Sequence, residues 1–177
     1  MLLVQQPKLL VLDEPFSNLD PIHTDTLKVV LEDITERLQI TCLLTSHDPH
    51  DTLSWADKIL VMKEGKFLQE GTPGEVYYKP LNEYVAGMFG KYNLLKPNIA
   101  ALFGIESNGN DVITRPEQFM INATGSGVKG IIQKICFWGS FYEAEMLVED
   151  VKIVARMMKN EWKVEEEVCL EFLKNHY

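Results

Sequence analysis

Two adjacent carboxylates, Asp13 and Glu14, end a short apolar segment that is typical of a buried strand. Strand interiors exclude charge, so acids at such a position lie at the rim of a sheet, where open α/β sheets bind their ligands. One carboxylate there can hold a magnesium ion through water while the other polarises an attacking water molecule. An ordinary strand exit with solvated acids is the alternative, and it is favoured when these two residues are considered alone.

A second polar cluster changes that balance. The segment 17–20 (SNLD) directly follows the two acids, and the segment 45–48 (TSHD) closes the next apolar run. If the two apolar runs are neighbouring parallel strands, His47 lies close to Asp13 and Glu14. A lone histidine is more often a structural residue, but polar residues at the tips of two consecutive strands favour a catalytic site.

The first half of the chain has the pattern of a parallel sheet covered by helices. Asp20 is expected to cap a helix that begins with Pro21, because Leu27, Leu31, Ile34 and Leu38 form one apolar stripe. The remaining elements are predicted as strands over 8–12 and 40–45, a short helix over 49–55, a hairpin turning at Glu64-Gly65, and helices within 73–79 and 81–89. This β-α-β-α order predicts the α/β class.

The second half changes character after about residue 93, where strand-like runs replace helices. Strands are predicted over 111–114, 118–122, 130–137, 142–149 and 151–157, with glycines at the turns. Short strands at this spacing favour a small antiparallel barrel or sandwich. The acidic run 165–167 is predicted to be solvated surface. We expect two domains, residues 1–92 and residues 93–177.

Composition restricts the classes of function. The chain has 177 residues, of which 46% are hydrophobic and 24% are charged, with a net charge of −9. Such an acidic balance argues against nucleic-acid binding, which depends on Lys and Arg at phosphates. There is no apolar run of the roughly 20 residues that span a bilayer, and no secretory signal is recognised. Three widely spaced cysteines predict buried thiols, not a disulfide framework or a zinc site.

The motifs together resemble those of ATP-binding-cassette (ABC) transporter ATPases. Residues 9–20 (LLVLDEPFSNLD) resemble the Walker B strand and D-loop of that family, and residues 45–48 resemble its switch-histidine loop. Residues 77–90 resemble the segment that leads importer ATPases out of the nucleotide-binding domain, and residues 113–117 (ITRPE) resemble a strand of the transport-associated OB-like (TOBE) domain. The resemblance implies a partial P-loop NTPase sheet followed by a small all-β TOBE barrel.

The resemblance implies a role for each polar residue of the two clusters. Asp13 would orient magnesium through water, and Glu14 would polarise the hydrolytic water. His47 would contact the γ-phosphate of ATP. Ser17 and Asp20 would belong to the nucleotide site through the D-loop, which faces a second copy of the subunit in a homodimer. Phosphoryl transfer requires mainly positioning and charge stabilisation, so this small set is chemically sufficient.

Three motifs of the family are absent from the sequence: GxxxxGK[ST], an LSGGQ-like signature and the glutamine loop. All three lie upstream of the Walker B strand in the family, so the chain resembles the C-terminal portion of such an ATPase. We therefore expect that the isolated chain neither binds ATP tightly nor hydrolyses it. A sheet without its preceding strands would also expose an edge and an apolar face, which predicts self-association.

The function implied by the resemblance is that of an ATP-hydrolysing importer subunit. Such a subunit is cytoplasmic, peripheral on the inner face of the plasma membrane, and bound to transmembrane permease subunits. Polyamine or ferric iron is the favoured cargo, because residues 94–177 are short for the regulatory domain of sugar importers. The alternative is a non-enzymatic regulatory module that binds a small ligand or a partner subunit through the TOBE barrel.

Overall fold

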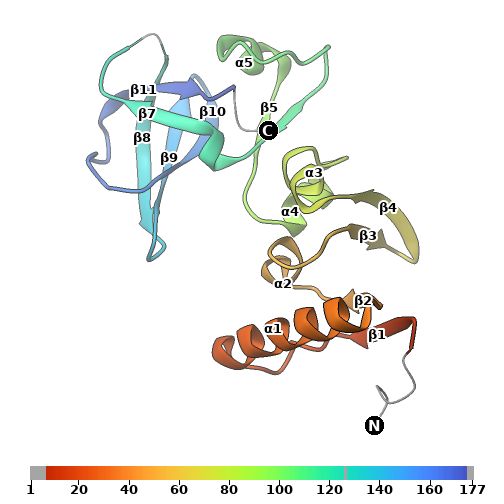
Figure 1. Ribbon diagram of the computed structural model, residues 1–177. Coiled ribbons are helices and arrows are strands. Elements are labelled where there is room, and N and C mark those ends of the chain that lie inside the picture. Colours follow the sequence, from red (N-terminus) through yellow and green to blue (C-terminus); the bar gives the residue numbers. More distant parts are fainter. Residues whose placement is uncertain (1–6, 126, 175–177) are drawn as a thin grey trace. The chain divides into compact units, whose positions relative to one another are not determined.

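The computed structural model describes residues 7–125 and 127–174 (Figure 1). The chain divides into two compact units, residues 1–59 and residues 60–177. A small parallel sheet in the first unit and a five-stranded antiparallel sheet in the second confirm the predicted fold class. The domains 1–92 and 93–177 stay a prediction. Among the described residues, no helix has both the length and the apolar character needed to cross a bilayer.

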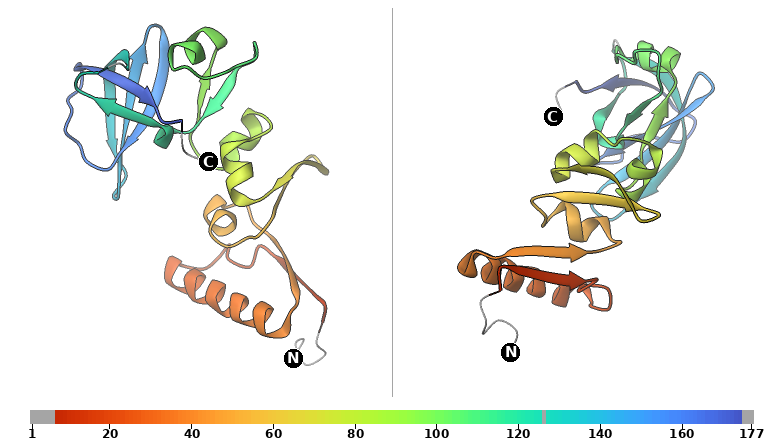
Figure 2. Two further views of the ribbon diagram at one scale, coloured as in Figure 1. Left: turned by 45° about the horizontal axis from the view of Figure 1, so that its top comes forward. Right: turned by 90° about the vertical axis from the view of Figure 1, so that its right-hand side faces the viewer.

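The first unit is a two-stranded parallel sheet with a long helix alongside it. Strand β1 (Leu9–Asp13) pairs with β2 (Thr41–Thr45), and the connection between them is α1 (Pro21–Leu38); α2 (Pro49–Leu53) follows β2. The right-hand view of Figure 2 shows the two strands side by side with α1 running along them. Helix α1 begins as predicted, since the Asp20 side chain accepts a hydrogen bond from the His23 N–H and Pro21 stands in the first turn.

Within the described part of the first unit, one face of the sheet is covered and the other is open. Leu9 is 52% exposed, Val11 59% and Leu43 47%, whereas Leu10 and Leu12 on the opposite face are half-buried. The strand that ends in the two carboxylates is therefore not buried on both faces, and that expectation is corrected. The exposed apolar side chains agree with the expectation that a sheet without its preceding strands exposes an apolar face.

The three cysteines are free and half-buried, where the sequence predicts buried thiols. Cys42 lies on β2, on the half-buried face of that strand. Even this partial burial raises the pKa of the Cys42 thiol, because desolvation disfavours the thiolate.

The second unit begins with a hairpin and two short helices. Strand β3 (Ile59–Lys63) turns into β4 (Lys66–Gly71), and α3 (Pro73–Tyr78) and α4 (Glu83–Met88) follow. Glu64 and Gly65 both have positive φ, 51° and 75°, as a two-residue hairpin turn requires, so the predicted turn is confirmed. Thr72 and Glu75 form a capping box that fixes the start of α3.

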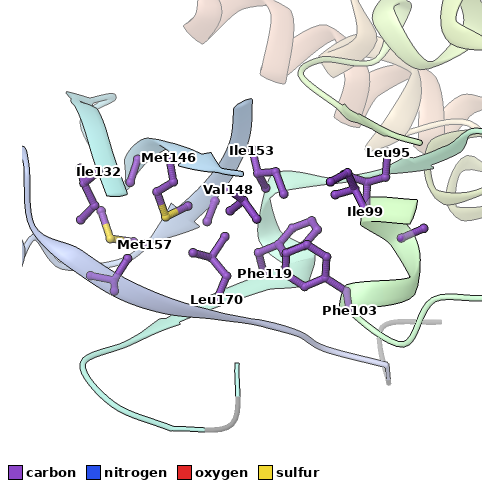
Figure 3. Packing of buried hydrophobic residues seen from close by; sticks show 14 residues of the cluster. Leu95, Ile99, Phe103, Phe119, Ile132, Met146, Val148, Ile153, Met157 and Leu170 are labelled. Atoms are coloured by element: carbon purple, nitrogen blue, oxygen red, sulfur yellow. The ribbon is translucent and has the colours of Figure 1, made fainter. Parts of the chain in front are cut away.

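The rest of the second unit is a β structure around one apolar core. A short pair is formed by β5 (Asn93–Leu95) and β6 (Val112–Thr114), with α5 (Pro97–Leu102) between them. The main sheet has the order β10-β9-β8-β11-β7, made of β7 (Phe119–Asn122), β8 (Val128–Phe137), β9 (Tyr142–Val148), β10 (Val151–Met157) and β11 (Glu167–Phe172). Figure 3 shows Phe103 and Phe119 next to each other in this core, and their ring centroids are 5.2 Å apart.

Two elements of this region correct the sequence predictions. Strand β11 was not predicted; it begins at Glu167, the last residue of the acidic run, whose Glu165 and Glu167 are solvent-exposed as expected. Its side chains alternate, since Val168 and Leu170 are buried while Glu167 and Glu171 point to solvent, and the acidic residues hide this pattern in the sequence. Helix α5 also shows that the region is not purely β; it buries Ile99 and Ala100 against the core.

A buried arginine ties the two short helices of the second unit to its strands. Arg115, which follows β6, is 1% exposed. Its Nε donates to the Tyr77 carbonyl at 2.9 Å, and its Nη1 donates to the carbonyls of Ala86, Gly90 and Lys91 at 3.0, 3.2 and 3.0 Å. The guanidinium also lies 4.1 Å from the centre of the Tyr77 ring. These carbonyls lie at the ends of α3 and α4 and in the turn before β5, where helical donors run out, so one side chain donates to four of them; the Ala86 carbonyl also accepts from the Phe89 N–H at 3.2 Å.

We predict that Arg115→Met lowers the free energy of unfolding of the second unit by at least about 3 kcal/mol, because it leaves several buried carbonyls without a donor. Urea unfolding followed by the fluorescence of Trp138 and Trp162, both in this unit, measures the change. Lys96→Met is the matched control, since it removes an exposed ion pair to Asp111 and should cost below about 1 kcal/mol. Equal effects of the two substitutions would refute the anchoring role of Arg115.

Candidate active site

Parallel pairing in the first unit sets the polar ends of β1 and β2 against each other. Asp13 lies opposite Thr45 in the register. The Thr45 hydroxyl donates to Asp13 Oδ1 at 2.5 Å and accepts from the Glu14 N–H at 3.0 Å, while the Thr45 carbonyl accepts from the same N–H at 3.1 Å. Thr45 therefore fixes both carboxylate residues, a role that its place in the sequence cluster did not reveal.

The structure brings Glu14 and His47 together. Glu14 Oε1 lies 3.2 Å from His47 Nδ1, and both side chains are solvent-accessible, at 48% and 75%. The Glu14 backbone has φ of 44°, in the left-handed region that costs a non-glycine residue energy. The turn is held by Ser17, whose N–H and hydroxyl both donate to the Glu14 carbonyl, at 3.2 and 3.0 Å. A carboxylate on such a strained backbone, within contact distance of an imidazole, is an arrangement suited to proton transfer.

Ser17 and Asp20 have different local roles. Ser17 stabilises the turn below Glu14, whereas Asp20 caps α1. The Asp20 carboxylate accepts from the His23 N–H at 3.1 Å and lies 2.6 Å from His23 Nδ1. These hydrogen bonds lower the pKa of the Asp20 carboxyl, first through the His23 N–H and then through its side chain. Asp20 thus lies apart from the Asp13, Glu14 and His47 group that the strand ends assemble.

A hollow of about 450 Å³ opens beside Glu14 and His47. Its lining comes from the two loops after the strands and from α1 and α2, and it includes Ser17, Lys28 and Asp51. Lys28 and Asp51 form a shielded ion pair of 3.2 Å, which no sequence motif indicated. The pair joins residues 23 positions apart in different helices, so its signal is tertiary and cannot be read from local spacing.

The donor chemistry of the site suits a hard cation held together with a ligand. Among residues 7–125 and 127–174, no group of three or more His, Cys, Asp or Glu side chains is arranged to hold a metal. Magnesium commonly uses one or two carboxylates and completes its shell with water and phosphate oxygens. The exposed carboxylate of Asp13, oriented by Thr45, fits that mode.

Comparison with known proteins gives a consistent set of relatives. No protein-family model matches the chain. The spermidine/putrescine import ATP-binding protein of Borrelia garinii subsp. bavariensis is 33% identical over 94% of this chain and 52% of its own length. The sulfate/thiosulfate import ATP-binding protein of Synechocystis sp. is 32% identical over 90% of this chain and 48% of its own length. The Fe(3+) ions import ATP-binding protein of Fusobacterium nucleatum is 34% identical, over 77% and 42%.

The chain spans about half the length of the curated relatives it matches. Among solved structures, it is similar to cbiO1 of Clostridium perfringens, described as part of the ABC transporter complex cbiONQ. That match has 38% identity, covers 42% of this chain and 30% of the other, and has a TM-score of 0.40.

We predict that Thr45→Val lowers the free energy of unfolding of the first unit by about 0.5–1.5 kcal/mol, because Asp13 loses a hydrogen-bond donor and the Glu14 N–H loses one of two acceptors. It should also speed hydrogen exchange at the Glu14 amide. Thr41→Val, the same change at the other end of β2, is the control. Equal effects of both substitutions on the Glu14 amide would contradict the role assigned to Thr45.

Proposed function

The chain is a relative of the ATP-binding subunits of ABC importers over most of its length, and from this premise we propose that it forms part of the ATP-hydrolysing subunit of such an importer. The observation that carries the proposal is the 3.2 Å contact between Glu14 and His47 where two parallel strands end. Sheets of this kind bind ligands at the carboxyl ends of their strands.

In the proposed reaction, the Glu14 carboxylate accepts a proton from the water that attacks the terminal phosphate. His47 contacts Glu14 through Nδ1, so Nε2 is the ring nitrogen directed to a phosphate oxygen. General-base chemistry needs a carboxylate within hydrogen-bond reach of the water, and the Glu14 side chain is open to water. The strained Glu14 backbone supports the same role, because such strain persists where the surroundings enforce it.

Asp13 is the residue proposed to hold magnesium through water. Its carboxylate is oriented by the Thr45 hydroxyl at 2.5 Å and lies next to Glu14 in the chain. Bound Mg–ATP supplies the transferable phosphoryl group and the charge that stabilises its transfer. Ser17 and Asp20 are proposed to face a second copy of the subunit, with Asp20 serving also as the cap of α1.

The proposed active form contains a second copy of the subunit. The sequence has no phosphate-cradling GxxxxGK[ST] loop and no LSGGQ-like signature, so this chain alone is proposed to be inactive. A homodimeric subunit on the cytoplasmic face of the membrane, bound to permease subunits, is the setting in which Glu14 and His47 would meet a nucleotide. Polyamine or ferric iron is the proposed cargo, in keeping with the names of two of the relatives above.

The proposal is tested with a chimaera in which this chain replaces the segment of the Borrelia garinii relative that it aligns with. We predict that the chimaera hydrolyses Mg–ATP and that Glu14→Gln lowers turnover about a hundredfold or more while ATP still binds, because the general base is lost. Phosphate release measures turnover. The isolated chain is expected to release none.

Glu36→Gln is the matched control for Glu14→Gln. Glu36 is exposed on α1, outside the site, so its substitution should leave turnover unchanged. Full activity of the Glu14→Gln chimaera would overturn the role of Glu14. A folded chimaera without any activity would instead favour the regulatory module as the function of this chain.

A separate prediction concerns the cargo. Cells in which the gene is deleted should lose uptake of radiolabelled putrescine and spermidine, or of ferric iron, and should recover it when the gene is restored. Sulfate uptake serves as the comparison, because one relative is named for sulfate and thiosulfate import. Selective loss of sulfate uptake would contradict the proposed cargo and leave the proposed reaction unaffected.

A further inference from the structure

We propose that Lys28 is a positioning residue that holds the loop bearing Glu14 and the loop bearing His47 in one arrangement. The proposal deepens the function proposed above and rests on it for its catalytic meaning. Lys28 lies on α1, and its side chain is only 14% exposed. It lines the hollow beside the two proposed catalytic side chains.

On one side, Lys28 contacts α2, which begins two residues after His47. Its Nζ lies 3.2 Å from Asp51 Oδ1 and donates to the His50 carbonyl at 3.3 Å. Asp51 Oδ2 in turn accepts from the Ser46 hydroxyl at 3.0 Å, and the Ser46 oxygen accepts from the Asp48 N–H at 3.0 Å. This connected set of hydrogen bonds reaches both chain neighbours of His47.

On the other side, Lys28 contacts the turn that follows Glu14. Its Nζ lies 5.4 Å from the centre of the Phe16 ring, within the range of a cation–π contact. Phe16 is 5% exposed and stands two residues after Glu14, between Pro15 and Ser17. One cation therefore contacts both the turn that follows Glu14 and the helix α2, whose Asp51 is hydrogen-bonded to Ser46 next to His47.

The contact between Glu14 and His47 is too weak to fix the positions of these two side chains. Both side chains are exposed, and exposed ion pairs contribute little to stability. The pair of Lys28 with Asp51 is shielded, with side-chain exposures of 14% and 12%, so separating it would leave a charge without a partner in a poorly solvated place. The Lys28–Asp51 pair is thus the stronger restraint on the backbone around the site, and it sets where the Glu14 and His47 side chains lie.

Two near-isosteric variants of the full chain test the proposal without any nucleotide. Lys28→Met keeps an unbranched apolar side chain and removes the charge, and Asp51→Asn keeps the shape and removes the opposite charge. We expect both variants to lose the NMR cross-peak between the His47 ring and the Glu14 side chain. Hydrogen exchange at the Asp48 amide should become about tenfold faster, because the loop opens locally.

Two controls separate positioning from general stability. Lys28→Arg restores a cation and should keep the cross-peak, and Asp33→Asn removes an exposed ion pair with Arg37 on the same helix and should change neither readout. Wild-type cross-peak and exchange in Lys28→Met and in Asp51→Asn would overturn the proposal. If Lys28→Met loses the wild-type circular dichroism spectrum, the Asp51→Asn result decides. Because no nucleotide is used, these outcomes are independent of whether the chimaera hydrolyses ATP.

Discussion

The parallel register of β1 and β2 is the constraint on which the first unit depends. Side chains on a strand alternate between faces, so a shift by one residue would turn every side chain to the opposite face. In the observed register Asp13 lies opposite Thr45, and the Thr45 hydroxyl contacts both Asp13 and the Glu14 N–H. A shift would break this contact, and it would also move His47 along the edge of the sheet away from Glu14.

Residues with strong local preferences made parts of the fold predictable. Asp20 and Pro21 mark the start of α1, and Glu64-Gly65 marks the turn between β3 and β4, because each acts through its own backbone conformation. The closeness of Glu14 and His47 was expected from strand order. By contrast, β11 was missed, since its exposed acidic residues dominate its short sequence while burial of Val168 and Leu170 depends on distant strands.

The residues that support the site and the second unit also act through distant contacts that local sequence does not show. Residues 113–117 (ITRPE) resemble a strand of the TOBE domain, but the sequence alone does not explain what Arg115 contacts. In the structure Arg115 reaches carbonyls 24 to 38 positions away, which no local pattern encodes. Lys28 with Asp51 is the parallel case in the first unit. In both units a shielded cation from one element holds the loop or helix ends of another, where backbone and side-chain oxygens need donors.

Exposure of the proposed catalytic pair follows from the two-layer construction of the first unit. A single helix covers one face of a two-stranded sheet, so the strand ends and the loops beyond them remain in contact with water. Water screens electrostatic interactions at these two side chains, and electrostatic stabilisation of a transition state is far stronger where water is excluded. The chain therefore contains an ordered pair of chemical groups without the enclosure that would make them effective. A second protein surface that covered this edge of the sheet would exclude water without moving Glu14 and His47. Their positions are set within this chain, by Thr45 and by the contacts of Lys28.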